Sequence, residues 1–512
     1  MGAGVEYKSS EIFIGAVPLG GTNPVRIQSM TNTDTLDTKA SVAQCIRIIE
    51  AGADFVRLTA QGVREAENLA IIRKELRKAG FITPLIADIH FNPAAAEIAA
   101  RLVEKIRINP GNYADKRASF TKAEFTEKEY TEELERIHER LLPLIRICNE
   151  NRTVIRIGIN HGSLSDRIMT RYGNTPEGMV RSAMEFINIL RSENFNNLVL
   201  SMKSSDTAVM LEANRKLVRE LQAEGLSYPI HLGVTEAGEG EDGRVRSAVG
   251  IGALLSEGIG DTVRVSLSED PENEIPVAKE IVKITGGNTG RVEDNSVSAL
   301  PFKPRETRYI PVVMSDVNGK YIGEDGKIFT GKMKTFHAGS ILQPETAGDE
   351  DLILNPVFSE DDPVKLAIDA AAITGKYFIL RQAGGICITN KGKVNNEKLK
   401  EISFSILQAS EARMTGNRYI SCPTCGRTKF NLQDEVKKVK EATKSYSGLK
   451  IAIMGCIVNG PGEMAGADYG YVGAGEGLVH IYRGTDLVIK NVPQEGAVKE
   501  LMRIIEEDHI NL

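Results

Sequence analysis

The sequence lacks any apolar run that approaches the ~20 residues needed to cross a bilayer. Its first ten residues also lack the apolar segment of a secretory signal. Six cysteines in 512 residues are too few for a disulfide framework, and they favour a reducing compartment. We therefore expect a cytoplasmic protein with no membrane partner, in which clustered cysteines bind metal rather than form disulfides.

An excess of positive charge is also missing. The chain has 63 lysines and arginines against 69 aspartates and glutamates, for a net charge of −6. General affinity for nucleic acid needs a basic surface, so we expect no nucleic-acid partner. The length suggests about three domains at ~100–200 residues each.

Short apolar strands alternate with amphipathic helices in the first half of the chain. Eight such units match a (β/α)8 barrel of the TIM type, and a doubly wound parallel sheet is the alternative. We expect this barrel over residues 1–287, an α/β insertion domain over 288–414 and an α+β domain over 415–512. The expected barrel strands are 24–29, 54–59, 84–90, 105–109, 153–160, 197–203, 229–236 and 261–266.

The insertion segment contains no motif that carries recognisable chemistry, which favours a spacer or packing domain. Its pattern predicts strands at 309–314 and 377–380 and helices at 363–374 and 397–413.

Polar residues close most of the barrel strands at period-two spacing, so they point into the barrel mouth, where active sites of this fold are built. Like charges in one mouth are costly unless an anion neutralises them, and arginine matches phosphate geometry. The pattern therefore predicts a phosphate-binding mouth, and the alternative is that each arginine pairs with a barrel carboxylate. The five cations at strand ends, called the cation cluster below, are Arg57, Arg107, Arg156, Lys203 and Arg264.

A second group of reactive residues lies near the C-terminus, with the spacing C-x2-C-x30-C-x6-E. It comprises Cys422, Cys425, Cys456 and Glu463, with glycines nearby. Thiolates prefer iron–sulfur clusters or zinc, and glycines let backbone amides approach cluster sulfurs. Zinc usually takes a second C-x-x-C or a histidine pair, which the downstream half lacks. A thioredoxin-type dithiol would leave the third cysteine unexplained.

The remaining cysteines, Cys45, Cys148 and Cys387, lie in apolar or helical stretches and are interpreted as small hydrophobic residues.

A carboxylate at position 463 is a harder, more exchangeable ligand for iron than a thiolate. Such a ligand suits catalysis better than simple electron transfer.

Several motifs together resemble a known family. The C-terminal ones are Cys-Pro-Thr-Cys-Gly-Arg at 422–427 and Met-Gly-Cys-Ile-Val-Asn-Gly-Pro-Gly-Glu at 454–463. The barrel ones are Gln-Ser-Met-Thr-Asn-Thr-Asp-Thr at 28–35, Ala-Asp-Ile-His-Phe at 87–91, Lys-Ile-Arg-Ile-Asn-Pro-Gly-Asn at 105–112, His-Leu-Gly-Val-Thr-Glu-Ala-Gly at 231–238 and Gly-Asp-Thr-Val-Arg-Val-Ser-Leu at 260–267. Over residues 10–287 and 415–512 the chain resembles the 4-hydroxy-3-methylbut-2-enyl diphosphate synthases of the non-mevalonate isoprenoid pathway.

The resemblance implies an iron–sulfur oxidoreductase that opens 2-C-methyl-D-erythritol 2,4-cyclodiphosphate reductively. It implies one 4Fe-4S cluster on Cys422, Cys425, Cys456 and Glu463, with reduced flavodoxin or ferredoxin as the electron donor. Glu236 would be the acid/base group, with a pKa raised by the nearby phosphates. The implied substrate-binding residues are Arg57, Arg107, Asn109, Arg156, Asn160, Lys203, Arg264 and Ser266.

The insertion at 288–414 resembles the long form of the family, in which an inserted domain lets the cluster domain close over the barrel of its own chain. In the compact form, closure occurs across a homodimer. The insertion is shorter than the ~250 residues of a second complete barrel, so closure within one chain and closure in a homodimer both stay open.

Overall fold

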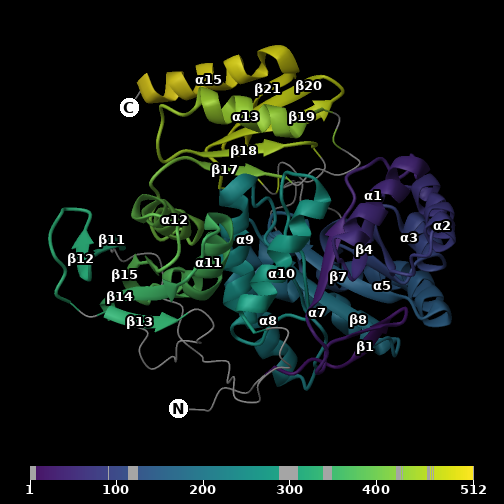
Figure 1. The fold of residues 1–512 in the computed structure, drawn as a ribbon. Coiled ribbons are helices and arrows are strands. Elements are labelled where there is room, and N and C mark those ends of the chain that lie inside the picture. The colour runs from purple at the N-terminus through teal and green to yellow at the C-terminus, as the bar shows by residue number, and fades with distance from the viewer. Residues whose placement is uncertain are drawn as a thin grey trace.

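In its described residues, the computed structural model shows a two-stranded hairpin and three larger β-sheets with their covering helices (Figure 1). None of its described helices combines the length and the apolar composition needed to cross a membrane. The structure describes residues 7–89, 91–113, 125–286, 310–331, 333–337, 349–422, 428, 430–457, 462, 464 and 466–510.

The first sheet is a parallel barrel, which confirms the predicted fold class. Its strands follow the order β8-β7-β6-β5-β4-β3-β10-β9. A parallel bridge between Leu200 and Ile230 brings the last strand back to the first. The strands are β3 (Arg26–Met30), β4 (Phe55–Ala60), β5 (Leu85–Ile89), β6 (Lys105–Ile108), β7 (Val154–Asn160), β8 (Leu198–Lys203), β9 (His231–Leu232) and β10 (Thr262–Val263).

Two of these strands are shorter than the sequence predicts, because β9 and β10 keep regular pairing for two residues each. After β9 the chain passes Gly233, where an added Cβ would lie 2.5 Å from Lys203 Nζ. The absence of a side chain at Gly233 therefore leaves room for the side chain of Lys203, which ends β8.

The barrel helices begin at side-chain caps, which satisfy amide groups that a first turn leaves open. Asp37 caps α1, Asp206 caps α8, and Thr126 forms a capping box with Glu129 at the start of α5. The main helices are α1 (Thr38–Glu50), α2 (Val63–Lys78), α3 (Pro93–Ala100), α5 (Glu127–Asn151), α7 (Pro176–Ser192), α8 (Thr207–Ala223), α9 (Gly240–Leu255) and α10 (Glu274–Ile284).

A hairpin that the sequence analysis did not predict closes the amino-terminal end of the barrel. Its strands are β1 (Ile12–Ile14) and β2 (Val17–Leu19). Ile14 and Leu19 form one buried apolar cluster with the starts of the barrel strands, including Phe55 and Val154. This plug leaves the opposite end, where the cations lie, as the open mouth.

The second sheet, in the insertion, has the order β12-β11-β15-β14-β13, with β16 beside β14. The predicted strand at 377–380 is wrong, since α11 runs over Pro363–Ile379. Tyr377 and Phe378 favour strands by residue type, but here they are buried helix residues. The elements are β11 (Val312–Val317), β12 (Lys320–Gly323), β13 (Met333–His337), β14 (Asp349–Phe358), α11, β15 (Ala383–Cys387), β16 (Thr389–Asn390) and α12 (Asn396–Ala409).

The third sheet has the order β17-β18-β19-β20-β21, parallel over its first three strands and antiparallel over the rest. It lies above the carboxyl ends of the barrel strands of the same chain (Figure 1). The elements are β17 (Arg418–Ser421), α13 (Leu432–Ala442), β18 (Lys450–Met454), β19 (Tyr469–Gly475), β20 (Leu478–Arg483), β21 (Asp486–Pro493) and α15 (Gln494–Ile510).

The insertion is fixed to the barrel by a close crossing of α11 and α9 (Figure 1). An added Cβ at Gly252 of α9 would lie 2.7 Å from both Cα and O of Ala372. An added Cβ at Gly375 of α11 would lie 2.8 Å from a methyl group of Val249. Glycines on both helices therefore allow a nearly direct backbone approach.

We expect Gly252→Ala to destabilise the chain by about 1–3 kcal/mol, because the new methyl group meets backbone that cannot rotate away. Gly496→Ala is the matched control, since Gly496 lies in α15 with nothing within 4 Å of an added Cβ. It should be neutral or stabilising by up to ~1 kcal/mol through helix propensity. Thermal unfolding of both variants checks this, and equal melting temperatures would contradict it.

Candidate functional site

The register of the parallel strands brings the cation cluster together. Arg107 on β6 lies beside Arg156 on β7, and Asp88 on β5 lies beside Arg107. Lys203 ends β8 beside Asn160. All five cations are buried, with exposed fractions of 7% or less. The mouth thus contains five like charges that are removed from water.

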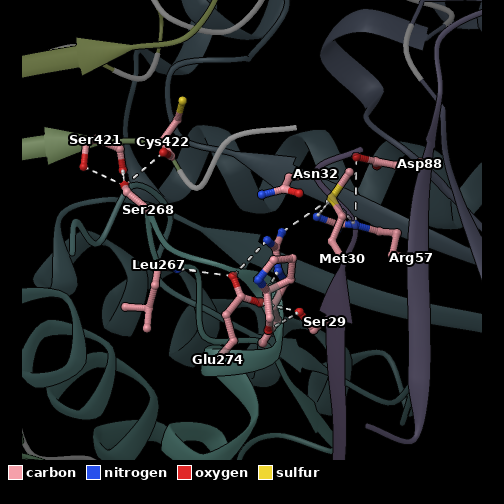
Figure 2. Close-up of polar contacts among 12 residues, drawn as sticks. Ser29, Met30, Asn32, Arg57, Asp88, Leu267, Ser268, Glu274, Ser421 and Cys422 are labelled. Atoms are coloured by element: carbon pink, nitrogen blue, oxygen red, sulfur yellow. Dashed lines mark hydrogen bonds and ion pairs between the residues drawn. The ribbon is translucent and has the colours of Figure 1, made fainter. Parts of the chain in front are cut away.

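Carboxylates partner three of the five cations. Asp88 lies 3.9 Å from Arg57 and 3.4 Å from Arg107, while Glu274 accepts from Nε and Nη2 of Arg264, each at 3.2 Å. Figure 2 shows Asp88 beside Arg57, and Glu274 beside Ser29 and Leu267. These three arginines therefore pair with barrel carboxylates, which is the alternative that the sequence left open. Glu274 was missed in the sequence because it begins a helix beyond the eighth strand.

The ion pairs of the mouth among the described residues include neither Arg156 nor Lys203. Nε and Nη1 of Arg156 are buried and lack a hydrogen-bond acceptor within the described part of the chain. Burial, followed by repulsion from Arg57 and Arg107, lowers the pKa of Arg156 well below its usual value. Burial and the neighbouring arginines do the same to the pKa of Lys203. The mouth thus holds positive charge that an anion would stabilise.

A second polar layer lies beneath the cluster. Lys105 is two residues before Arg107 on β6, and its ammonium lies 3.5 Å from Gln28 Oε1 and 4.9 Å from the centre of the Phe55 ring. Burial and the charge of Arg156 lower the pKa of Lys105. The sequence analysis did not select Lys105, although its period-two relation to Arg107 was available.

The other proposed substrate-binding residues also lie in the mouth. Asn160 Oδ1 accepts from Arg107 Nη2 at 3.3 Å, and Asn109 Oδ1 accepts from the Gly111 amide at 3.3 Å. Asn109 Nδ2 is buried without an acceptor among the described residues. Ser266 is buried beyond β10. These amide and hydroxyl groups would supply neutral contacts beside the cations.

Glu236 follows β9 at the rim of the mouth. Its backbone has φ of 49°, a left-handed conformation that is uncommon for a residue with a side chain, and the residue is 4% exposed. A cavity of about 10 Å³ lies between Glu236 and Asn160, which is room for one water. The next residue, Ala237, forms a parallel bridge with Ser421 of β17. The proposed acid/base residue therefore lies next to the C-terminal sheet.

Two of the four proposed cluster ligands are described, and both follow parallel neighbouring strands. Cys422 follows β17, Cys456 follows β18, and both are half-buried. The Gly455 amide donates to Cys422 Sγ at 3.3 Å, so the carboxyl ends of β17 and β18 bring these residues together. Thiols with an amide donor fit an iron–sulfur cluster. Cys425 and Glu463 lie outside the described residues.

The other cysteines are buried apolar residues, as their sequence context predicts. Burial raises the pKa of Cys45, Cys148 and Cys387 to about 12 in each case. Such thiols are poor nucleophiles and poor metal ligands at neutral pH.

We expect Arg156→Met to raise the stability of the anion-free chain by ~1 kcal/mol or more, since a pKa depressed by one unit corresponds to about 1.4 kcal/mol. Pyrophosphate should raise the melting temperature of the wild type and raise that of the variant much less.

Arg167→Met provides the matched control for this prediction. Arg167 is equally buried but pairs with Glu185 at 2.7 Å, so its loss should cost ~3–5 kcal/mol. Thermal unfolding with and without pyrophosphate distinguishes the two arginines. An Arg156→Met chain as destabilised as Arg167→Met would contradict the interpretation of Arg156 as an unpaired charge.

Comparison with known proteins follows the same division of the chain. Residues 9–279 match the GcpE TIM-barrel domain, and residues 418–507 match the GcpE protein C-terminal domain. The chain is 44% identical to 4-hydroxy-3-methylbut-2-en-1-yl diphosphate synthase (flavodoxin) of Bacteroides fragilis, with 98% of this chain and 95% of that protein covered. It is 36% identical to the protein of the same name from Leptospira interrogans, with 98% and 97% covered.

Among solved structures, dihydropteroate synthase from Stenotrophomonas maltophilia is similar at a TM-score of 0.37 and 13% identity, over 56% of this chain and 100% of that one. A likeness at this level carries no argument about function. The matches to both domains and to full-length relatives are decisive instead. The chain therefore belongs to the GcpE family of 4-hydroxy-3-methylbut-2-en-1-yl diphosphate synthases.

Proposed function

We propose that this chain opens the ring of 2-C-methyl-D-erythritol 2,4-cyclodiphosphate reductively, to give (E)-4-hydroxy-3-methylbut-2-enyl diphosphate in the non-mevalonate isoprenoid pathway. Two electrons and two protons enter, a ring carbon–oxygen bond breaks, and one water leaves. The observation that carries the proposal is a mouth with two buried cations, Arg156 and Lys203, that have no ion-pair partner among the described residues, close to the half-buried thiol of Cys422, which follows β17 where Ser421 bridges to Ala237.

The cation cluster would bind the cyclic diphosphate. Arginine donates to phosphate oxygens in a bidentate manner, while lysine acts as a point charge. Within the described residues, no ion pair would have to break for Arg156 and Lys203 to bind an anion, whereas Arg57 and Arg107 pair with Asp88, and Arg264 pairs with Glu274. The carboxylates would hold those three arginines in place for the incoming anion. Asn109, Asn160 and Ser266 would add neutral hydrogen bonds.

Glu236 would deliver a proton to the oxygen that leaves the carbon. It lies at the rim between the mouth and the C-terminal sheet, and its strained backbone holds the carboxyl group in a buried position. An anionic diphosphate nearby would disfavour the carboxylate and keep a proton on the group. Binding of the substrate would therefore keep Glu236 protonated and ready to act as the acid.

Cys422, Cys425, Cys456 and Glu463 would hold one 4Fe-4S cluster, which supplies the electrons when it is bound. The relatives named above carry flavodoxin in their names, and reduced flavodoxin is the donor we propose, with ferredoxin as the alternative. The amide of Gly455 would stabilise the thiolate of Cys422, since its hydrogen bond favours negative charge on sulfur.

The direct test is an anaerobic assay with the cyclic diphosphate and an artificial reductant, with iron and sulfide counted on the same sample. We expect the loaded wild type to form the linear diphosphate. Glu236→Gln should keep its iron and bind substrate, yet lose turnover by about 10²–10⁴-fold, as expected for loss of a general acid.

Glu224→Gln serves as the control, because Glu224 makes a surface pair with Arg191 at 3.2 Å. It should match the wild type in turnover. A cluster-loaded wild type that leaves the cyclic diphosphate unchanged would refute the proposed function. Stoichiometric zinc without iron or sulfide after anaerobic purification would favour a non-redox enzyme instead.

A further inference from the structure

The C-terminal sheet meets the barrel mouth through the end of one strand, β17. The contacts between the described parts include the bridge of Ala237 with Ser421 and a hydrogen bond from Arg246 to the carbonyl of Tyr419 at 3.4 Å. Lys440 of α13 pairs with Glu239 at 3.2 Å. Arg418 at the start of β17 also donates to the carbonyl of Ser205 at 2.7 Å, so several polar contacts among the described residues join the C-terminal sheet to the barrel.

Ser268 lies at the centre of this junction, and it is 1% exposed. Its Oγ lies 2.8 Å from Ser421 Oγ, 3.0 Å from the carbonyl oxygen of Cys422 and 3.4 Å from the carbonyl oxygen of Ser421. Figure 2 shows its hydroxyl directed at both residues. One serine of the barrel therefore holds the backbone of a proposed cluster ligand.

The same serine is tied to the anion-binding side of the mouth. Its amide donates to the carbonyl of Gly238, two residues after Glu236, at 2.9 Å. The amide of the preceding residue, Leu267, donates to Glu274 Oε1 at 3.2 Å, and Glu274 in turn holds Arg264. A continuous series of contacts thus runs from Arg264 to Cys422, as the dashed lines of Figure 2 trace in part.

We propose that Ser268 is a positioning residue that fixes the backbone of Ser421 and Cys422 over the barrel mouth. The inference rests on the proposed function for its consequence in catalysis, but the contact itself does not. A serine hydroxyl carries one proton, so it donates to a carbonyl oxygen of 421 or 422 while it accepts from the Ser421 hydroxyl.

Alanine at 268 would leave these buried groups without their partner. It would remove no contact of the cation cluster described above, because Glu274 binds the Leu267 amide and not the side chain of 268. Ser268→Ala therefore separates the placement of the Ser421 and Cys422 backbone from the binding of the anion.

The test compares wild-type holoenzyme with Ser268→Ala, Ser421→Ala and the double variant. Backbone hydrogen exchange over residues 419–422 should be about 5-fold faster in Ser268→Ala, the factor that corresponds to one net hydrogen bond. Ser421→Ala should show a smaller increase, and the double variant should add little to Ser268→Ala, because both serines act through one contact.

In turnover, kcat of Ser268→Ala should fall by a similar factor, while KM for the cyclic diphosphate changes less than twofold and iron and sulfide contents match the wild type. Ser192→Ala is the control, since Ser192 is exposed and its hydroxyl donates to the carbonyl of Ile189 within its own helix. It should equal the wild type in every readout.

Unchanged exchange over 419–422 would overturn the inference, as would an unchanged kcat despite faster exchange. Loss of iron in Ser268→Ala would also overturn it, because the serine would then retain the cluster rather than position it. Hydrogen exchange needs no substrate, so a wild type without turnover would refute the proposed function while the exchange comparison still tests Ser268.

Discussion

Positive charge buried in excess at the carboxyl end of the barrel is the constraint on which the rest of the structure depends. Asp88 pairs with Arg57 and Arg107, and Glu274 pairs with Arg264. Arg156 and Lys203 have no ion-pair partner among the described residues. Burial of unpaired charge costs free energy, and the depressed pKa values of both groups report that cost. This unpaired positive charge supports the proposal that the mouth binds an anion.

The other parts of the structure close the far end of the barrel, pack on its flank and cover its mouth. The β1–β2 hairpin packs its apolar side chains under the barrel and closes the far end. Helix α11 fixes the insertion to the flank of the barrel, where glycines let α11 and α9 approach closely. The C-terminal sheet then lies over the mouth of its own chain, with Cys422 beside the loops that follow β9 and β10 (Figure 1). An insertion shorter than a second barrel is therefore long enough for the C-terminal sheet to lie over the barrel of its own chain.

Period-two spacing at strand ends predicted which side chains meet in the barrel mouth, because parallel strands bring their carboxyl ends to one place. Arg107 and Arg156 lie in register as that rule predicts. The same spacing could have found Lys105, one layer lower. It could not have found Glu274 or Ser268, which approach the mouth from a helix and a loop, since no periodicity governs such positions. The strand predicted at 377–380 failed because packing of α11 on α9 overrode the β propensity of Tyr377 and Phe378.

The sequence by itself determined the barrel, the cations at its strand ends and the thiol motifs, because each is a local pattern of residue types and spacings. The family could be inferred from the same patterns. Only the tertiary structure decided which cations have carboxylate partners and which have none, since ion pairs join residues far apart in the chain. It also decided that Ser268 holds the carbonyl of Cys422 across 154 residues of sequence. Such contacts depend on how the sheets pack against each other, and that packing leaves no local pattern in the sequence.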